Sequence, residues 1–157
     1  MKLGFLTACL PQRSLAELCR WAAAHDFDAL EVVTWPDDGT RPSTARHLNV
    51  VGFGEREAHA TRSLFDEHDL VCSSIAYYDN NLHPDPAKRT AAHQHLHRCI
   101  DAAASIGCPT VGTFVGRDWH RSVADNLIAA AEVFAPLVDH AGQVGVKIIV
   151  ENCVMEG

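Results

Sequence analysis

The sequence predicts an α/β fold in which helices cover a parallel β-sheet. Helical patterns alternate along the chain with short apolar runs, and an aspartate or a glycine separates each helix from the strand that follows. These separators are residues 26, 69, 107 and 145, at spacings of 43, 38 and 38 residues. Such alternation is typical of a parallel sheet with right-handed crossovers. It fits either an open doubly wound sheet or the first part of a (β/α)8 barrel.

Five strands are predicted from these mostly apolar runs. They span residues 3–8, 29–33, 71–76, 110–114 and 146–150. Apolar side chains on both faces are typical of strands in a parallel sheet that is covered by helices. A complete (β/α)8 barrel takes about 250 residues, so a chain of this length holds little more than half of one.

Four helices are predicted between the strands, and three of them have recognisable start signals. Residues 14–17 form a capping box, Asp85-Pro86 places an N-cap before a proline at the first helical position, and residues 122–125 have the S-x-x-D pattern. The helix ends agree, because glycine or an aspartate that tolerates a left-handed backbone commonly follows a helix. Pro136 lies inside the last helical pattern and is expected to kink that helix.

Length and charge narrow the class of protein. The 157 residues suit a single domain that spans the whole chain, and 47% hydrophobic residues suit a globular core. A formal net charge of −7 disfavours a nucleic-acid surface, because phosphate binding needs clustered lysines and arginines. No run approaches the roughly 18 apolar residues of a membrane span. Neither nucleic acid nor a membrane is therefore an expected partner.

The cysteines and the amino terminus indicate a cytoplasmic protein. The six cysteines include no C-x-x-C pair, which argues against a structural zinc site and a thioredoxin-like motif. They are typical of reduced thiols in the cytoplasm. The first nine residues carry too little charge and too short an apolar run for a secretory signal. The glycine motifs of dinucleotide, nucleotide and hydrolase sites are absent from the sequence.

Glu151 is the strongest candidate for chemistry. It follows the fifth predicted strand directly, and α/β enzymes place their active sites at the carboxyl ends of parallel strands. Polar and aromatic side chains are also frequent after the second, third and fourth strands, at residues 34–54, 77–85 and 115–120. Glu31 lies inside the second strand, where we expect its carboxylate either to form a salt bridge within the barrel or to contact a substrate.

A histidine-rich run occupies residues 93–97 in the third predicted helix. His93 and His97 are one helical turn apart, which would allow them to chelate a metal adventitiously. We interpret the run as a solvent-exposed helix face, because helices lie outside a parallel sheet and away from the strand ends.

Five segments of the chain resemble the sugar phosphate isomerase/epimerase group of the xylose isomerase-like TIM barrels. They are residues 2–7, 27–31, 77–89, 113–117 and, above all, 148–155 with the sequence IIVENCVM. The resemblance runs over essentially all 157 residues. It implies the N-terminal portion of a (β/α)8 TIM barrel, with about five parallel strands and four helices and with the C-terminal part of the barrel absent.

This resemblance implies a metal-dependent isomerase or epimerase in carbohydrate metabolism that acts on a sugar or sugar phosphate. Glu151 takes the place of the first of about four metal ligands and also serves as an acid/base group, and the other ligands come from later strands. The implied metal is Mn²⁺, Mg²⁺ or Co²⁺, with Zn²⁺ possible. It stabilises an enediolate while carboxylates move the proton next to the carbonyl. With an incomplete ligand set, we expect this chain to be inactive alone and to bind Mn²⁺ weakly if at all.

Four further residues are implied as substrate contacts. Trp35 and Tyr77 would wall the sugar, Arg117 would hold a phosphate or a hydroxyl, and Glu156 would contact the sugar. An endonuclease acting at abasic DNA sites is a disfavoured relative, because the net charge is −7 and no histidine stands directly after the second or third strand.

Two alternatives stay open. An inositol-type dehydratase of the same superfamily would have a similar metal site. A non-catalytic half barrel, acting as a binding or scaffold module, would associate through its open barrel edges and form a homo-oligomer, since unpaired edge strands and uncovered apolar side chains favour association.

Overall fold

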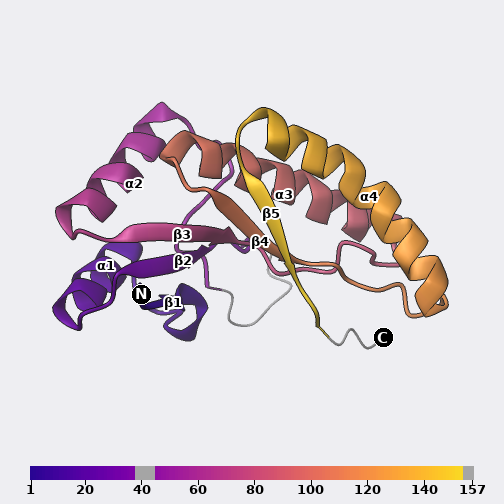
Figure 1. Ribbon diagram of the computed structural model, residues 1–157, viewed down its shortest axis with the longest axis horizontal. Coiled ribbons are helices and arrows are strands. Elements are labelled where there is room, and N and C mark those ends of the chain that lie inside the picture. The colour runs from indigo at the N-terminus through magenta and orange to yellow at the C-terminus, as the bar shows by residue number, and fades with distance from the viewer. Residues whose placement is uncertain (38–44, 154–157) are drawn as a thin grey trace.

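The structure is a computed structural model that describes residues 1–37 and 45–153. Strands and helices alternate along the chain as predicted (Figure 1). The strands are β1 (Gly4–Leu6), β2 (Ala29–Val33), β3 (Val71–Ala76), β4 (Thr110–Phe114) and β5 (Lys147–Glu151). The helices are α1 (Leu15–Ala24), α2 (Glu55–Glu67), α3 (Pro86–Ile106) and α4 (Val123–Gln143). The five strands and four helices of the described residues confirm the predicted composition of the fold.

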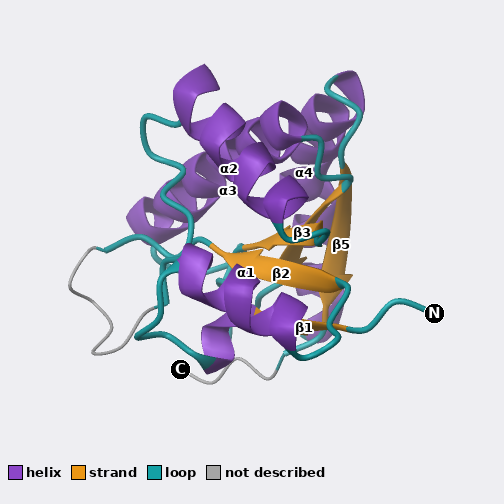
Figure 2. Cartoon of the chain, turned by 90° about the vertical axis from the view of Figure 1, so that its left-hand side faces the viewer, coloured by secondary structure: helices purple, strands orange, loops and turns teal. Residues whose placement is uncertain are grey.

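The strand order decides between the two predicted architectures. Neighbouring strands are all parallel and follow the order β1-β2-β3-β4-β5. Right-handed crossovers between sequential neighbours place every helix on the same face of the sheet. A doubly wound sheet instead carries helices on both faces. All four helices pack buried side chains into one core with the strands, and α2, α3 and α4 lie together above the strands in Figure 2, so the fold is the first part of a (β/α)8 barrel.

Each α/β repeat ends in a left-handed backbone conformation, as the separators predicted. The φ angles are 60° at Asp26, 52° at Asp69, 74° at Gly107 and 76° at Gly145. A residue with a Cβ atom pays roughly 1–2 kcal/mol for this conformation, and aspartate tolerates it better than most. The regular spacing in the sequence therefore marks the points where helices turn back into the sheet.

The main hydrophobic core lies between the sheet and the helices. Leu18 of α1, Leu30 of β2, Leu96 and Ile100 of α3 and Val111 of β4 are each no more than 1% exposed. Complete burial of such a side chain contributes about 1.5–3 kcal/mol. This packing holds the strands, and so their carboxyl ends, in fixed relative positions.

The first strand differs in detail from its predicted form. The first strand stops at Leu6, and Thr7–Cys9 form a short 3-10 helix. At this point the Thr7 hydroxyl, in place of a backbone carbonyl, accepts a hydrogen bond from the backbone N–H of Val33 at 3.1 Å. Helix α4 contains Pro136, as the helical pattern predicted.

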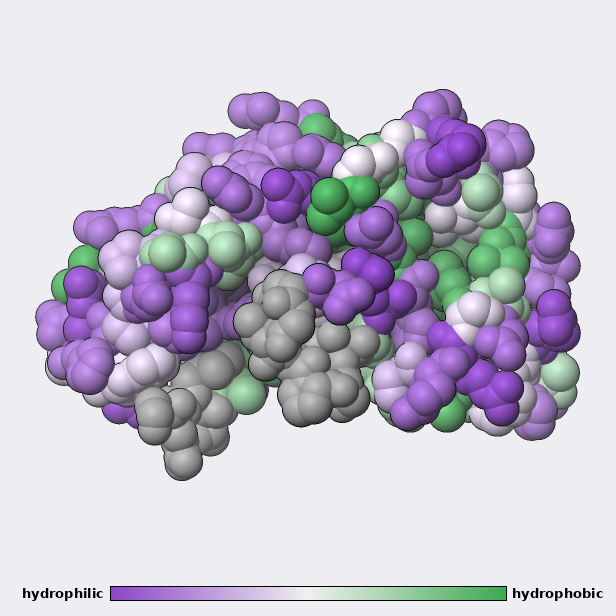
Figure 3. All heavy atoms as spheres, turned by 180° about the vertical axis from the view of Figure 1, so that it is seen from behind, coloured by the Kyte–Doolittle hydropathy of each residue, from purple (hydrophilic) through white to green (hydrophobic). Residues whose placement is uncertain are grey.

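Within the described residues both edge strands of the sheet are open. β1 pairs with β2 alone and β5 pairs with β4 alone. Ile149 and Val150 of β5 are 42% and 52% exposed, and Val123 and Leu127 of α4 are 69% and 67% exposed. Seen from behind, the surface is mainly hydrophilic with hydrophobic patches between (Figure 3). In the described part of the chain, no helix has the length and apolar character needed to cross a membrane.

Candidate functional site at the barrel mouth

Two carboxylates and a phenol meet at the carboxyl end of the sheet. Glu31 comes from β2, Tyr78 follows β3, and Glu151 ends β5. The Tyr78 hydroxyl lies 2.7 Å from Glu31 Oε1 and 3.0 Å from Glu151 Oε1. Side chains from three separate α/β repeats therefore converge where (β/α)8 enzymes place their chemistry. This group of three residues is called the mouth cluster below.

Burial and charge set the protonation of the mouth cluster. Burial raises the pKa of Glu31 and outweighs the hydrogen bond from Tyr78, and the negative charge of Glu151 raises it further. Burial and the two carboxylates, Glu31 before Glu151, raise the pKa of Tyr78 as well, so the phenol keeps its proton. A phenol has one proton to donate, and two carboxylate oxygens lie within reach of it. The phenol proton can therefore be donated to either carboxylate.

Gly112 of β4 leaves the space that the mouth cluster occupies. A Cβ atom at this position would lie 2.7 Å from the Tyr78 hydroxyl oxygen and 2.9 Å from Glu31 Oε1. Both distances are shorter than normal van der Waals contacts. Glycine in a strand interior commonly marks such a close approach.

A cavity of about 500 Å³ opens at the mouth cluster and is called the mouth cavity below. Besides the cluster it is lined by Leu6, Trp35, Asp79, Asn80, Phe114 and Cys153. The Trp35 indole N–H donates to the carbonyl oxygen of Tyr78 at 3.1 Å, and the Tyr78 ring packs on Phe114 with centroids 4.8 Å apart. Aromatic walls with a few convergent polar groups are typical of small-molecule sites.

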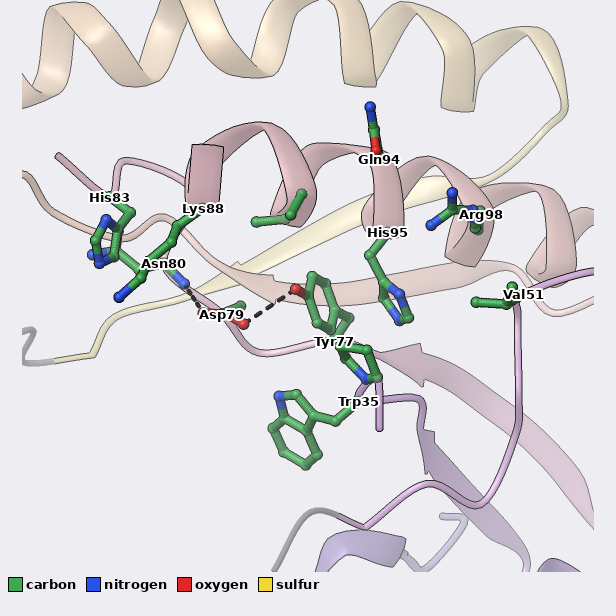
Figure 4. Close-up of a pocket in the computed structure, with 13 residues that line it drawn as sticks. Trp35, Val51, Tyr77, Asp79, Asn80, His83, Lys88, Gln94, His95 and Arg98 are labelled. Atoms are coloured by element: carbon green, nitrogen blue, oxygen red, sulfur yellow. Dashed lines mark hydrogen bonds between the residues drawn. The ribbon is translucent and has the colours of Figure 1, made fainter. Parts of the chain in front are cut away.

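Tyr77 lines a different cavity, because consecutive residues of an extended chain point to opposite sides. This second cavity of about 490 Å³ lies beside α3 (Figure 4). The Tyr77 hydroxyl donates to Asp79 Oδ2 at 3.1 Å, and its ring packs on His95 with centroids 4.3 Å apart. Trp35 lines both cavities. Two aromatic residues were expected to wall the sugar. Trp35 lines the same cavity as Glu151, whereas Tyr77 lines only the second cavity among those described.

His95 corrects the interpretation of the histidine run as a solvent-exposed face. It is 4% exposed, and its Nε2 lies 2.7 Å from the carbonyl oxygen of Thr34, directly after β2. The prediction was wrong because it ignored the helical period, which places His95 on the same face as Ala92 and Cys99. Both of those residues are buried, so this face of α3 packs against the sheet.

Arg117 and Glu156 are not placed at the cluster. Arg117 is exposed and lies outside the described lining of both cavities. Its backbone N–H donates to Asn80 Oδ1 and its carbonyl accepts from Asn80 Nδ2, each at 2.8 Å. These bonds tie the loop after β4 to the loop after β3. Glu156 lies outside the described residues.

Sequence reasoning missed Tyr78 of the mouth cluster and Gly112 beside it. Strand alternation carries the signal for Tyr78, because it shares a face with Ser74 and Ala76, and Ser74 pairs with Glu31 in the sheet. The signal for Gly112 is a glycine inside an otherwise β-rich run. Without the strand register, neither signal shows that Tyr78 and Gly112 lie beside Glu31.

The described residues supply suitable donors for a hard cation but not a complete metal site. Residues 1–37 and 45–153 contain no group of three or more His, Cys, Asp or Glu side chains that could hold a metal. Carboxylate oxygens such as those of Glu31 and Glu151 are the donors that Mg²⁺ and Mn²⁺ prefer. Further donors are needed from beyond this part of the chain.

Comparison with known families agrees with this geometry. Residues 19–157 match the family model of the xylose isomerase-like TIM barrel. The chain belongs to this family. A search of curated protein sequences finds no match.

Several solved structures are similar to the chain. A D-psicose 3-epimerase with D-tagatose from Clostridium cellulolyticum H10 aligns with a TM-score of 0.71 at 14% identity, covering 94% of this chain and 51% of that one. The IOLI protein with a bound zinc atom gives 0.70 at 17%, covering 96% and 51%. A xylose isomerase-like protein from Mycobacterium smegmatis in complex with magnesium gives 0.68 at 16%, covering 95% and 54%. These identities show the fold alone, and the chain spans about half the length of such structures.

Proposed function

We propose that this chain forms the first half of the active site of a metal-dependent isomerase or epimerase that acts on a sugar or sugar phosphate. The observation that supports this most is the mouth cluster, in which Glu31, Tyr78 and Glu151 converge at the carboxyl end of a parallel sheet. Two of the similar solved structures were obtained with zinc or magnesium, and one is a sugar epimerase.

In this proposal Glu151 has two roles, as a metal ligand and as an acid/base group. A bound Mn²⁺, Mg²⁺, Co²⁺ or Zn²⁺ would supply Lewis-acid stabilisation of the charge that develops on the sugar oxygens. The Glu151 carboxylate lies in the mouth cavity, where it can take a proton from the carbon next to a carbonyl and return it. Trp35 forms the wall of that cavity against which a sugar ring would pack.

The other proposed sugar contacts have less geometric support. Tyr77 lines the second cavity, where it would contact only a part of the substrate that reaches beyond Trp35. Arg117 lies in the loop after β4 and outside the described lining of the mouth cavity, so a contact with a phosphate would require its side chain to turn inward.

Metal binding by the chain and by Glu151→Gln tests the proposal. We expect isothermal titration with Mn²⁺ to show weak binding to the chain and none to Glu151→Gln, because the amide loses the charge that a hard cation requires. The chain alone should exchange no deuterium from D₂O into a ketose, since the described residues do not complete the site. Equal Mn²⁺ affinity in both proteins would contradict the role of Glu151.

A second candidate function is a non-catalytic half barrel that binds partners through its open edges. The exposed apolar side chains of β5 and α4, among them Val150 and Leu127, favour it. Uncovered strands and apolar surface promote association between chains. In this case the chain would form a homo-oligomer, and Glu151 would have no metal to hold.

A further inference from the structure

Glu151 occupies the least supported position of the mouth cluster. It ends β5, which is an open edge strand among the described residues, and it is exposed along with the two residues that follow. In the part of the chain that the structure describes, the hydrogen bond to its carboxylate comes from Tyr78, 3.0 Å from Oε1. A glutamate side chain loses rotamer entropy when it is held in one conformer. A specific partner is therefore needed to hold it in one.

Tyr78 is far more firmly fixed than Glu151. It is 6% exposed, and its ring packs on Phe114. Its hydroxyl lies 2.7 Å from Glu31 Oε1, and its carbonyl oxygen accepts a hydrogen bond from the Trp35 indole. The phenol is thus held at its ring, its hydroxyl and its backbone. A fixed hydroxyl beside an exposed carboxylate can determine where that carboxylate points.

We propose that Tyr78, supported by Glu31, is the positioning residue for Glu151. The proposal rests on the proposed function, in which Glu151 is a metal ligand. The Tyr78 hydroxyl holds Oε1 of Glu151 and so fixes the orientation in which this carboxylate would be offered to a cation. Groups hydrogen-bonded behind a metal ligand orient it, and their removal typically lowers metal affinity about 10- to 100-fold.

The arrangement of Tyr78 and Glu31 requires a residue without a side chain at position 112, which is Gly112. The hydroxyl of Tyr78 and the carboxylate of Glu31 occupy the volume that a side chain at residue 112 would take. A Cβ atom at this position would press on the Tyr78 hydroxyl and Cζ and on Glu31 Oε1, and not on backbone atoms. Gly112→Ala therefore disturbs the same hydrogen bonds as Tyr78→Phe, but it leaves the amino acids that form these bonds unchanged.

Two measurements on the 157-residue chain test the role. The first is the ¹³C resonance of the Glu151 carboxyl group at a fixed pH, assigned by its loss in Glu151→Gln. The second is the Mn²⁺ dissociation constant from electron paramagnetic resonance. Tyr78→Phe and Gly112→Ala should both shift the resonance and weaken Mn²⁺ binding about tenfold. Thr61→Val removes a buried hydroxyl from α2, away from the mouth, and should change neither quantity.

The two measurements separate the positioning role from the proposed function. An unshifted Glu151 resonance in Tyr78→Phe overturns the positioning role, whether or not the chain binds Mn²⁺. A shifted resonance with unchanged Mn²⁺ affinity in Glu151→Gln upholds the hydrogen bond and overturns the metal site instead. Circular dichroism spectra that match the wild type show that each variant is folded, and Gly112→Ala repeats the test if Tyr78→Phe is not.

Discussion

At the scale of single residues, the barrel mouth depends on one phenol that contacts two carboxylates. Tyr78 bridges Glu31 and Glu151 with distances of 2.7 and 3.0 Å, and Gly112 provides the room. The sequence suggested either a salt bridge or a substrate contact for Glu31. Its partner in the structure is a neutral phenol, not a cation. A buried carboxylate with a neutral partner is less stable in its charged form than one in a salt bridge.

The raised pKa of Glu31 predicts how stability depends on pH. Because the folded state holds this proton more tightly than the unfolded state, Glu31 stabilises the fold below its ordinary pKa of 4.5. That contribution is lost as the pH rises from about 4.5 through the raised folded pKa. Urea unfolding at several pH values should show the wild type losing stability relative to Glu31→Gln over this window. A wild type that gains on Glu31→Gln as the pH rises would show that the sign is wrong.

At the scale of elements, the repeats are defined by the residues that end each helix. The left-handed positions at Asp26, Asp69, Gly107 and Gly145 recur because each helix must turn directly into a strand. This is why spacing alone predicted the number and order of the elements. The same local patterns do not contain the strand register, and the pairing of Tyr78 with Glu31 and Glu151 depends on that register.

A matched pair of glycine substitutions tests the importance of these turns. Gly107 has a φ of 74°, so Gly107→Ala should destabilise the chain by roughly 1–2 kcal/mol. Gly142 lies inside α4 with open space around its Cα, so Gly142→Ala should stabilise the chain by about 0.5 kcal/mol. Thermal or urea unfolding measures both. Similar effects of the two substitutions would contradict the special role of position 107.

At the scale of the whole molecule, the described residues form a partial barrel whose two edge strands, β1 and β5, are open. The sequence predicted five parallel strands with their helices, and the order of the strands then excluded a doubly wound sheet. It also predicted Glu151 at a strand end, where the structure places it. The sequence assigned Tyr77 rather than Tyr78 to the mouth and His95 to solvent, because both assignments ignored which face of a strand or helix carries the residue.

The open edge at β5 predicts association in solution. Val150 is 52% exposed and apolar, so Val150→Lys should weaken self-association by placing a charge on the edge strand. Sedimentation velocity over a range of concentrations measures the change. Ala60→Lys introduces the same charge at an exposed position of α2, away from β5 and α4, and serves as the control. If both variants and the wild type are monomeric at all concentrations, association through this edge is refuted.

The most direct test of the metal site is where Mn²⁺ binds on the isotopically labelled chain. Paramagnetic broadening of nuclear magnetic resonance signals reports which residues lie near the ion. We predict selective broadening of Glu151, Tyr78 and the Trp35 indole, all at the mouth cavity. Broadening centred on His93 and His97 of α3, with sharp signals at the mouth, would contradict the proposed site.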